Sequence, residues 1–226
     1  NTGQVSEDNL TVASQYLAVE AFDRVGKGGI NQLDLRYHQG SHDFLGSRDE
    51  SGNGGESTRT GGSGATAGGD FSKITLRYQR LQRISNRNSL LIRAEAQFSD
   101  DLLTSIEQFM VGGPNSVRAY PVAQYLGDEG AFGSLEWIFQ IVDGANSSFS
   151  MSAFGDFANG TLNDPLANEI ADQDLSGWGI GFAYTHTGNS GNQFSFRLDV
   201  ATPISDFEPT DGNDPQFYGS FSYAFR

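Results

Sequence analysis

The sequence of 226 residues contains no cysteine and no long apolar segment. The absence of cysteine excludes disulfide frameworks, thiolate zinc sites and cysteine nucleophiles. No apolar run approaches the ~20 residues that a membrane-spanning helix requires, and residues 90–92 are typical of the short runs present. Hydropathy alone would assign the protein to the water-soluble class. A membrane β-barrel escapes that test, because its apolar residues occupy only every second position.

Basic residues are also scarce, since 14 Lys and Arg stand against 28 Asp and Glu and give a formal net charge of −14. This composition excludes the clustered positive charge with which proteins release counterions from nucleic acids. The apolar fraction of 37% is low, yet 29 glycines and 12% aromatic residues exceed what a disordered acidic chain contains. We therefore expect a folded protein with no nucleic-acid partner.

The first ten residues are polar, begin with Asn1 and lack the apolar core of a secretion signal. The chain is accordingly expected to be either a mature product or a piece of a longer protein, and composition leaves both alternatives open.

Alternation of apolar and polar residues with period two is the dominant pattern. Comparable alternation occurs in residues 33–38, 74–79, 90–97, 134–141, 148–153, 177–184, 194–200 and 217–225. With weaker strands near 12–22 and 105–111, the sequence predicts about ten strands. No helical pattern of similar strength competes, so the protein is predicted to be all-β.

Two all-β architectures fit this pattern, a soluble sandwich and a transmembrane barrel. In a sandwich, mid-strand charges such as Arg77, Arg93 and Arg197 would form the solvated face. Strands of about 10–13 residues exceed the usual five or six and match the ~9–11 that cross a bilayer. Aromatic residues lie near strand ends, and only two lysines occur, although soluble sheets favour lysine on exposed edges. We therefore predict a transmembrane antiparallel β-barrel.

The connections between the predicted strands differ in length. Residues 85–88, 143–146 and 188–192 form short turns, whereas residues 40–70, 112–129 and 159–174 form long connections. The first long connection is rich in Gly, Ser and Thr, so we expect it to be mobile and assign it no function.

The sharpest local signal is the segment 112–130, which reads GGPNSVRAYPVAQYLGDEG. Its paired glycines and Pro114 end a strand, and a single Arg118 follows between apolar and aromatic residues. From the spacing alone, the segment is either an exposed loop with a solvated arginine or a loop that packs inward and delivers one charge.

This segment resembles the signature of two-partner secretion (TpsB) transporters, a family in the superfamily that also contains the BamA-type insertases. The shared pattern is a Gly-Gly pair, a Ser-Val-Arg-Gly-Tyr core, a Gly-Asp-x-Gly motif and a following strand that contains Glu. The matching residues are Gly112, Gly113, Ser116, Val117, Arg118, Tyr120, Gly127, Asp128, Gly130 and Glu136. Ala119 replaces the family's glycine, and because glycine permits a positive φ, this departure predicts an altered loop tip or reduced activity.

The resemblance covers nearly the whole chain, including Phe154-Gly155-Asp156 on the second strand after the loop and Ala201-Thr202-Pro203 at a strand end. The family barrel has about sixteen strands, five of which follow the signature loop, and five are predicted here. The resemblance thus implies that residues 1–226 are one domain, the C-terminal ten or so strands of the barrel, without POTRA modules or early strands. Such a piece is expected to form an open, curved sheet.

The resemblance further implies that the loop folds into the barrel lumen, where Arg118 meets Asp156 on the inner wall, with Phe154 and Glu136 as further partners. The alternation agrees, because Asp156 shares its face with Ser152 and the serines before it. A charge-assisted Arg–carboxylate pair at this place would position the loop.

Other candidate sites are weaker. Residues 177–181 (GWGIG) lack the following helix of a nucleotide-binding loop, and the pattern favours small lumen-facing residues that make room for the signature loop. The three histidines are too scattered for a metal site or a catalytic triad, and the acidic segment 164–174 fits a solvated loop better than a Ca²⁺ site. We find no nucleophile–base pair and expect no enzymatic activity, no cofactor and no metal.

The function that the resemblance implies is a protein-conducting transporter in the outer membrane of a Gram-negative bacterium. Its partners would be an exported polypeptide, outer-membrane lipid and the barrel-assembly machinery, and the last strand would carry the assembly signal in Phe221, Tyr223 and Phe225. Two alternatives stay open, a barrel-assembly insertase of the same superfamily and a soluble acidic β-sandwich that acts as an adhesion module.

Overall fold

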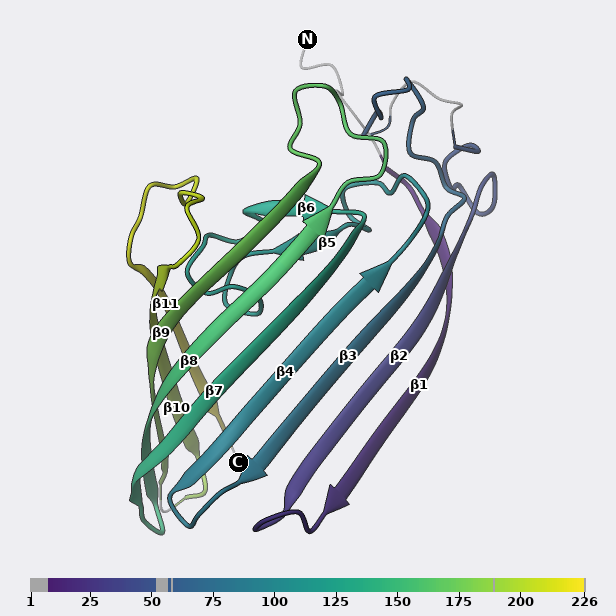
Figure 1. The fold of residues 1–226 in the computed structure, drawn as a ribbon. Helices are drawn as coiled ribbons and strands as arrows, with labels where there is room; N and C mark the ends of the chain where they lie inside the picture. Colours follow the sequence, from purple (N-terminus) through teal and green to yellow (C-terminus); the bar gives the residue numbers. More distant parts are fainter. Residues whose placement is uncertain (1–7, 52–56, 58, 189, 226) are drawn as a thin grey trace.

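The computed structural model describes residues 8–51, 57, 59–188 and 190–225. Its main element is one antiparallel sheet of nine strands in the order β1-β2-β3-β4-β7-β8-β9-β10-β11 (Figure 1). The remaining two strands, β5 and β6, pair only with each other. Among the described residues, none belongs to a helix with the length and apolar character that crossing a membrane requires.

The strands of the main sheet are long, and the ribbon formed by β5 and β6 is short. The bounds are β1 (Thr11–Asp23), β2 (Gly29–Ser41), β3 (Ser72–Arg83), β4 (Asn88–Phe98), β5 (Phe109–Val111), β6 (Tyr125–Gly127), β7 (Glu129–Asp143), β8 (Ser147–Thr161), β9 (Asp172–Thr187), β10 (Gln193–Pro203) and β11 (Gln216–Ala224). Short turns join the strands at one end of the sheet. The long connections gather at the opposite end, called the loop end below (Figure 1).

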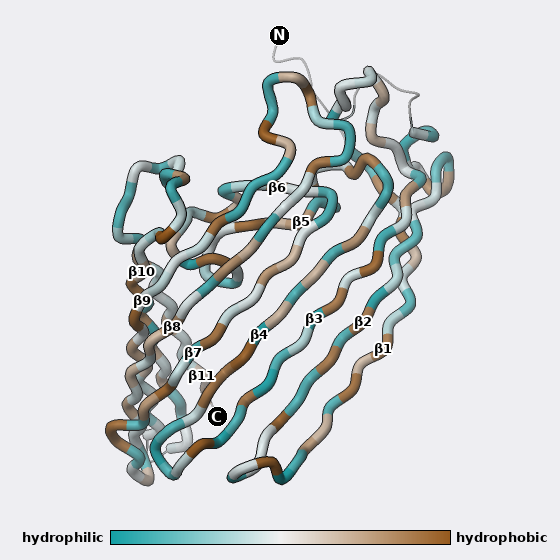
Figure 2. Tube along the Cα trace, viewed as in Figure 1, coloured by the Kyte–Doolittle hydropathy of each residue, from teal (hydrophilic) through white to brown (hydrophobic). Residues whose placement is uncertain are grey.

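Alternating polarity explains why these segments form strands. Successive side chains of a strand point to opposite faces, so a period of two places every apolar residue on one face. In β7, Leu135 and Trp137 point outward and are exposed, whereas Ser134 and Glu136 point inward and are buried. Figure 2 shows the same alternation of hydrophobic and hydrophilic residues along the other strands. The all-β prediction is confirmed.

The apolar face of the sheet has no second layer over it. Trp137, Phe157 and Phe221 are 60%, 52% and 66% exposed on this face. A sandwich would bury such residues against a second sheet about 10 Å away. Contiguous exposed apolar surface of this kind is typical of a protein that faces lipid. The sandwich alternative is therefore wrong.

The sheet is open, with β1 and β11 as its edge strands. It curves so that β10 and β11 lie behind β7 and β8 in the view of Figure 1. The expectation of an open, curved sheet is thus confirmed. Unpaired strand edges are unfavourable in lipid, because the hydrocarbon region offers no water to satisfy backbone groups.

The predicted number of sheet strands requires a correction. Four strands precede the signature segment instead of five, because residues 105–111 do not enter the main sheet. Gln97 of β4 pairs directly with Gly130 of β7, which leaves no space between these strands for another. Only Phe109–Val111 is extended, and it forms β5 in the separate ribbon.

The Gly-rich connection between β2 and β3, which we expect to be mobile, makes hydrogen bonds to a connection distant in sequence. Its described residues 59–70 contact the connection between β8 and β9. The amide of Gly62 donates to the carbonyl oxygen of Asp164 at 2.9 Å, and the Ser63 hydroxyl donates to the Asp164 carboxylate at 2.5 Å. Composition did not reveal these contacts because both partners are polar and lie about a hundred residues apart.

Candidate functional site

The chain between β4 and β7 leaves the sheet, and its residues 112–128, called the signature loop, pack against the inner face. Gly112 and Gly113 both adopt a positive φ, 99° and 98°, which turns the chain sharply after β5. The tip closes on itself, because the amide of Gly113 donates to the Tyr120 carbonyl at 3.0 Å and the amide of Tyr120 donates to the Val117 carbonyl at 3.2 Å. The loop is therefore a compact unit that satisfies part of its own backbone.

Arg118 at the loop tip is only 1% exposed, and the inner wall holds its guanidinium. Its Nε and Nη2 donate to the two oxygens of Asp156 at 2.8 and 2.9 Å, while Nη1 donates to Glu136 at 2.9 Å. The guanidinium carbon lies 3.3 Å from the centre of the Phe154 ring. A two-pronged Arg–carboxylate contact over an aromatic ring fixes both position and orientation. The structure therefore brings together the four residues singled out in the sequence.

Further charges surround this contact. Arg197 of β10 donates to Glu136 at 2.8 Å and to Asp199 at 2.9 Å, and Arg93 of β4 donates to the Ser134 hydroxyl at 3.3 Å. The cluster thus balances three arginines against three carboxylates; its charged members are Arg93, Arg118, Arg197, Glu136, Asp156 and Asp199. Buried charges require such compensation, and removal of one partner leaves the others exposed to a large desolvation cost.

Glycines in β9 provide the space for the tip. A Cβ atom on Gly177 would overlap the methyl group of Ala119, and one on Gly179 would lie 2.5 Å from the Phe154 ring. Ala119 itself does not adopt a positive φ. Alanine at position 119 therefore requires no left-handed backbone, and its methyl group packs directly against Gly177; whether this departure from the family's glycine lowers activity stays a prediction.

The last hairpin, β10–β11, also contacts the loop at Tyr120 and Gln124. The Tyr120 hydroxyl lies 2.7 Å from the Ser205 hydroxyl, and the Tyr218 hydroxyl donates to the Tyr120 carbonyl at 2.6 Å. Gln124 accepts from the amide of Thr210 at 3.0 Å. Since β7, β8 and β10 contact Arg118 while β11 and the connection before it contact Tyr120, the loop lies inside the curve of the sheet.

The loop base contains the Gly-Asp-x-Gly motif. Asp128 is fully buried, and its carboxylate accepts hydrogen bonds from the backbone amides of Leu103 and Asn163 at 3.1 and 2.6 Å.

The two glycines of this motif allow close approach of the backbone. A Cβ atom on Gly127 would lie 2.8 Å from the amide nitrogen of Thr161, and one on Gly130 would lie 2.7 Å from the carbonyl oxygen of Asn159.

Tyr125 ties the same base to the connection between β8 and β9, through hydrogen bonds of 2.7 and 2.9 Å to the carbonyl oxygens of Ile170 and Ala171. Burial raises the pKa of Tyr125 to about 12, so the hydroxyl remains a donor throughout the physiological range.

The other candidate residues are placed as follows. Val117 lies in the buried apolar cluster between the loop and the wall. Ser116 is 7% exposed, and its hydroxyl has no hydrogen-bond partner within the described part of the chain. Phe221, Tyr223 and Phe225 point outward at the β11 edge, away from the site.

The sequence pattern indicated Arg93 and Arg197 only as charges of a polar face, and it did not indicate a role for Asp199, Arg59, Ser134 or Tyr218. The parity of β10 places Arg197 and Asp199 on the inner face. The contact of Arg197 with Glu136, however, spans β8 and β9 and depends on the register of three strand pairs.

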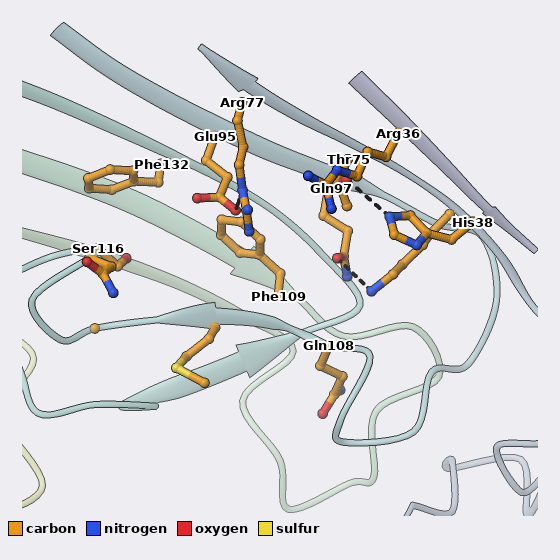
Figure 3. Close-up of a pocket in the computed structure, with 14 residues that line it drawn as sticks. Arg36, His38, Thr75, Arg77, Glu95, Gln97, Gln108, Phe109, Ser116 and Phe132 are labelled. Carbon is orange, nitrogen blue, oxygen red and sulfur yellow. Dashed lines mark hydrogen bonds and ion pairs between the residues drawn. The ribbon is translucent and has the colours of Figure 1, made fainter. Parts of the chain in front are cut away.

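A hydrophilic cavity of about 330 Å³ separates the loop from the wall formed by β2, β3 and β4 (Figure 3). Arg77 and Glu95, an ion pair at 2.8 Å, point from the wall toward the side where Phe109 and Ser116 lie. Charged and amide side chains from the wall share the lining with apolar side chains that include Phe109 and Phe132, and polar groups on the inner wall are typical of a hydrated passage.

No group of three or more His, Asp or Glu side chains is arranged to hold a metal ion among the described residues. In the acidic segment 164–174, the carboxylate of Asp164 accepts hydrogen bonds from the amide and hydroxyl of Ser63.

The fold and the site together define a transmembrane β-barrel protein with a loop folded onto its inner wall. The family model described as haemolysin secretion/activation protein ShlB/FhaC/HecB matches residues 4–184, and the chain belongs to this family. The resemblance to two-partner secretion transporters is thereby confirmed, and the family is one of transporters.

Among solved structures, the chain is similar to one described as CdiB from Escherichia coli, with 18% sequence identity and a TM-score of 0.67. The match covers 97% of this chain and 37% of that chain, so the protein spans about a third of the length of the relative. At this identity the likeness establishes the fold. A comparison with curated protein sequences found no significant match.

Proposed function

We propose that the protein forms part of the pore of an outer-membrane transporter that exports a partner polypeptide from a Gram-negative bacterium. The observation that carries the proposal is the burial of Arg118 against Asp156 and Glu136. The signature loop is a compact plug segment attached to the inner wall by polar contacts, which can be exchanged for water or for polypeptide groups. Export then requires the loop to detach from the inner wall and move aside within a hydrated lumen.

We further propose that additional strands complete the barrel. The edges of β1 and β11 present unpaired backbone groups, while the outer face is apolar from β1 to β11. Both properties are compatible with lipid only if further strands close the sheet. In this arrangement, outer-membrane lipid contacts the apolar face, and the signature loop lies in the lumen.

The secreted proteome tests the export function. In the native host, deletion of the gene should remove at least one polypeptide from the culture medium, and the intact gene should restore it. Quantitative mass spectrometry of medium and outer membranes measures both. Loss of many outer-membrane barrel proteins with an unchanged medium would instead favour the insertase alternative, and no change in either fraction would contradict the export proposal.

The outward aromatic residues of β11 are proposed to be read by the barrel-assembly machinery. Phe221 and Tyr223 are 66% and 45% exposed, and Phe221 packs edge-on against Phe194 at 4.9 Å between ring centres. Replacing Phe221 and Tyr223 together with serine should lower the amount of folded transporter in the outer membrane severalfold, because aromatic surface for recognition and lipid contact is lost. Ser220 and Ser222, both inward on the same strand, provide alanine controls that should insert normally. Equal insertion of both double variants, measured by heat-modifiable gel mobility, would disprove the assignment.

A further inference from the structure

The segment 59–70, called the clasp segment, crosses the loop end of the sheet to reach the signature loop. It belongs to the connection between β2 and β3, yet it contacts the connection between β8 and β9, beyond β4 and β7 in the sheet order. Arg59 is the charged residue of its buried side and is 8% exposed. A nearly buried arginine in a Gly-rich connection needs a fixed anionic partner.

That partner is Asp128 at the base of the signature loop. Arg59 Nη1 donates to the Asp128 carboxylate and also to the carbonyl oxygen of Leu103 at 3.3 Å, while Nη2 donates to the carbonyl oxygen of Asn163 at 2.7 Å. One guanidinium thus joins three segments that are distant in sequence. Lysine offers a single point of donation and cannot reproduce this fork.

Both the carboxylate and the carbonyl oxygen of Asp128 accept further hydrogen bonds. Its carboxylate accepts from Gln108 at 3.3 Å in addition to the amides of Leu103 and Asn163, and its carbonyl accepts from Gln97 at 2.9 Å. Arg59 is the one cation in ion-pair contact with Asp128 within the described residues. Removing Arg59 therefore leaves a fully buried carboxylate without a counter-charge, which loosens the base and the clasp segment together.

We propose that Arg59 and Asp128 form a second anchor for the signature loop, independent of the Arg118 anchor. The base anchor holds the clasp segment over the loop end and fixes where the loop emerges, while the tip anchor holds the loop against the wall. The two anchors share no residue, and the β5–β6 ribbon separates them along the loop. Release of the tip during export, which rests on the proposed function, then leaves the base in place.

The absence of native cysteine allows each anchor to be followed by thiol labelling. Ala67 in the clasp segment is 0% exposed and serves as the base reporter through Ala67→Cys. Ser116 at the tip is 7% exposed with an unpartnered hydroxyl, so Ser116→Cys is a near-isosteric tip reporter. A membrane-impermeant maleimide, applied to cells that carry the full-length protein, measures the labelling rate of each.

Arg59→Gln should raise the labelling rate at the base reporter about tenfold and leave the tip reporter within about twofold. Arg118→Ala should raise the labelling rate at the tip reporter about tenfold and leave the base reporter within about twofold. Arg59→Lys should give an intermediate base rate, because it retains the charge and loses the fork. Arg83→Gln removes the same charge from an exposed position at the turn end of β3, away from both reporters, and should change neither rate.

The proposal would be overturned if either variant raised the labelling rates of both reporters equally, since the base and the tip would then be released together as one cooperative unit. An unchanged base reporter in Arg59→Gln would overturn it as well. If Arg59→Gln fails to insert, the labelling rates of Arg59→Lys decide between these outcomes. Because labelling requires no exported partner, failure of this proposal is distinguishable from failure of the export function.

Discussion

Replacing Arg118 with alanine should reduce partner export at least tenfold while the amount of inserted transporter stays unchanged. The substitution leaves Asp156 and Glu136 buried without the guanidinium that both contact. Breaking a buried pair typically costs ~3–5 kcal/mol, and partial hydration of the lumen lowers that figure. Detachment of the tip, rather than unfolding of the sheet, is the expected consequence, because no strand of the main sheet depends on Arg118 for backbone pairing.

A double-mutant cycle tests this directly. Asp156→Ala should lower export comparably, and Arg118→Ala/Asp156→Ala should be no worse than the worse single variant, because each change removes the same interaction. The charge-swapped protein, Arg118→Asp/Asp156→Arg, should not recover export, since the new carboxylate would face Glu136 and Asp199. Export normalised to inserted protein is the measurement. Strictly additive losses would contradict the assigned contact.

Replacing Gly177 with alanine should displace the loop tip and reduce export severalfold, although it adds only one methyl group. That methyl would occupy the position of the Ala119 side chain and would lie 3.0 Å from the carbonyl oxygen of Thr202. Overpacking of this kind costs typically 1–3 kcal/mol. The tip is the element that yields, because Gly177 belongs to a sheet strand and is paired with Asp156 of β8 and Pro203 of β10.

A second substitution should compensate for the loss of export in Gly177→Ala. Ala119→Gly removes the opposing methyl group, so the double variant Gly177→Ala/Ala119→Gly should recover most of the lost export. Gly155→Ala is the matched control, because a Cβ there meets nothing within 4 Å. Labelling at the Ser116→Cys reporter should rise in Gly177→Ala and fall again in the double variant. If Gly177→Ala and Gly155→Ala give the same export and the same labelling rate, side-chain volume at position 177 does not determine how the tip packs against the wall.

The loop also connects the inner wall to one edge of the sheet. Arg118 contacts β7 and β8, whereas Tyr120, two residues later, contacts Ser205 and Tyr218 of the last hairpin. A displacement of the tip therefore acts on β10–β11 as well. In an open sheet, the edge strand is the element with the fewest partners to resist such a displacement.

Period-two alternation was sufficient to predict the strands and the faces of the sheet. In β8, for example, Ser152 and Asp156 had to share one face and Met151 the other, because successive side chains alternate whatever the surroundings. The family signature likewise indicated Arg118, Asp156, Phe154 and Glu136 before any contact was known. These predictions depend on residues that are local in sequence or match a motif.

Only the tertiary structure decided which inward residues meet. Arg197 reaches Glu136 across two intervening strands, and Arg59 reaches Asp128 over a separation of 69 residues. It also decided that residues 105–111 stay outside the main sheet, because the direct pairing of β4 with β7 closes that position. Such contacts depend on the accumulated register of several strand pairs and on where long connections fold back, and neither is a property of neighbouring residues.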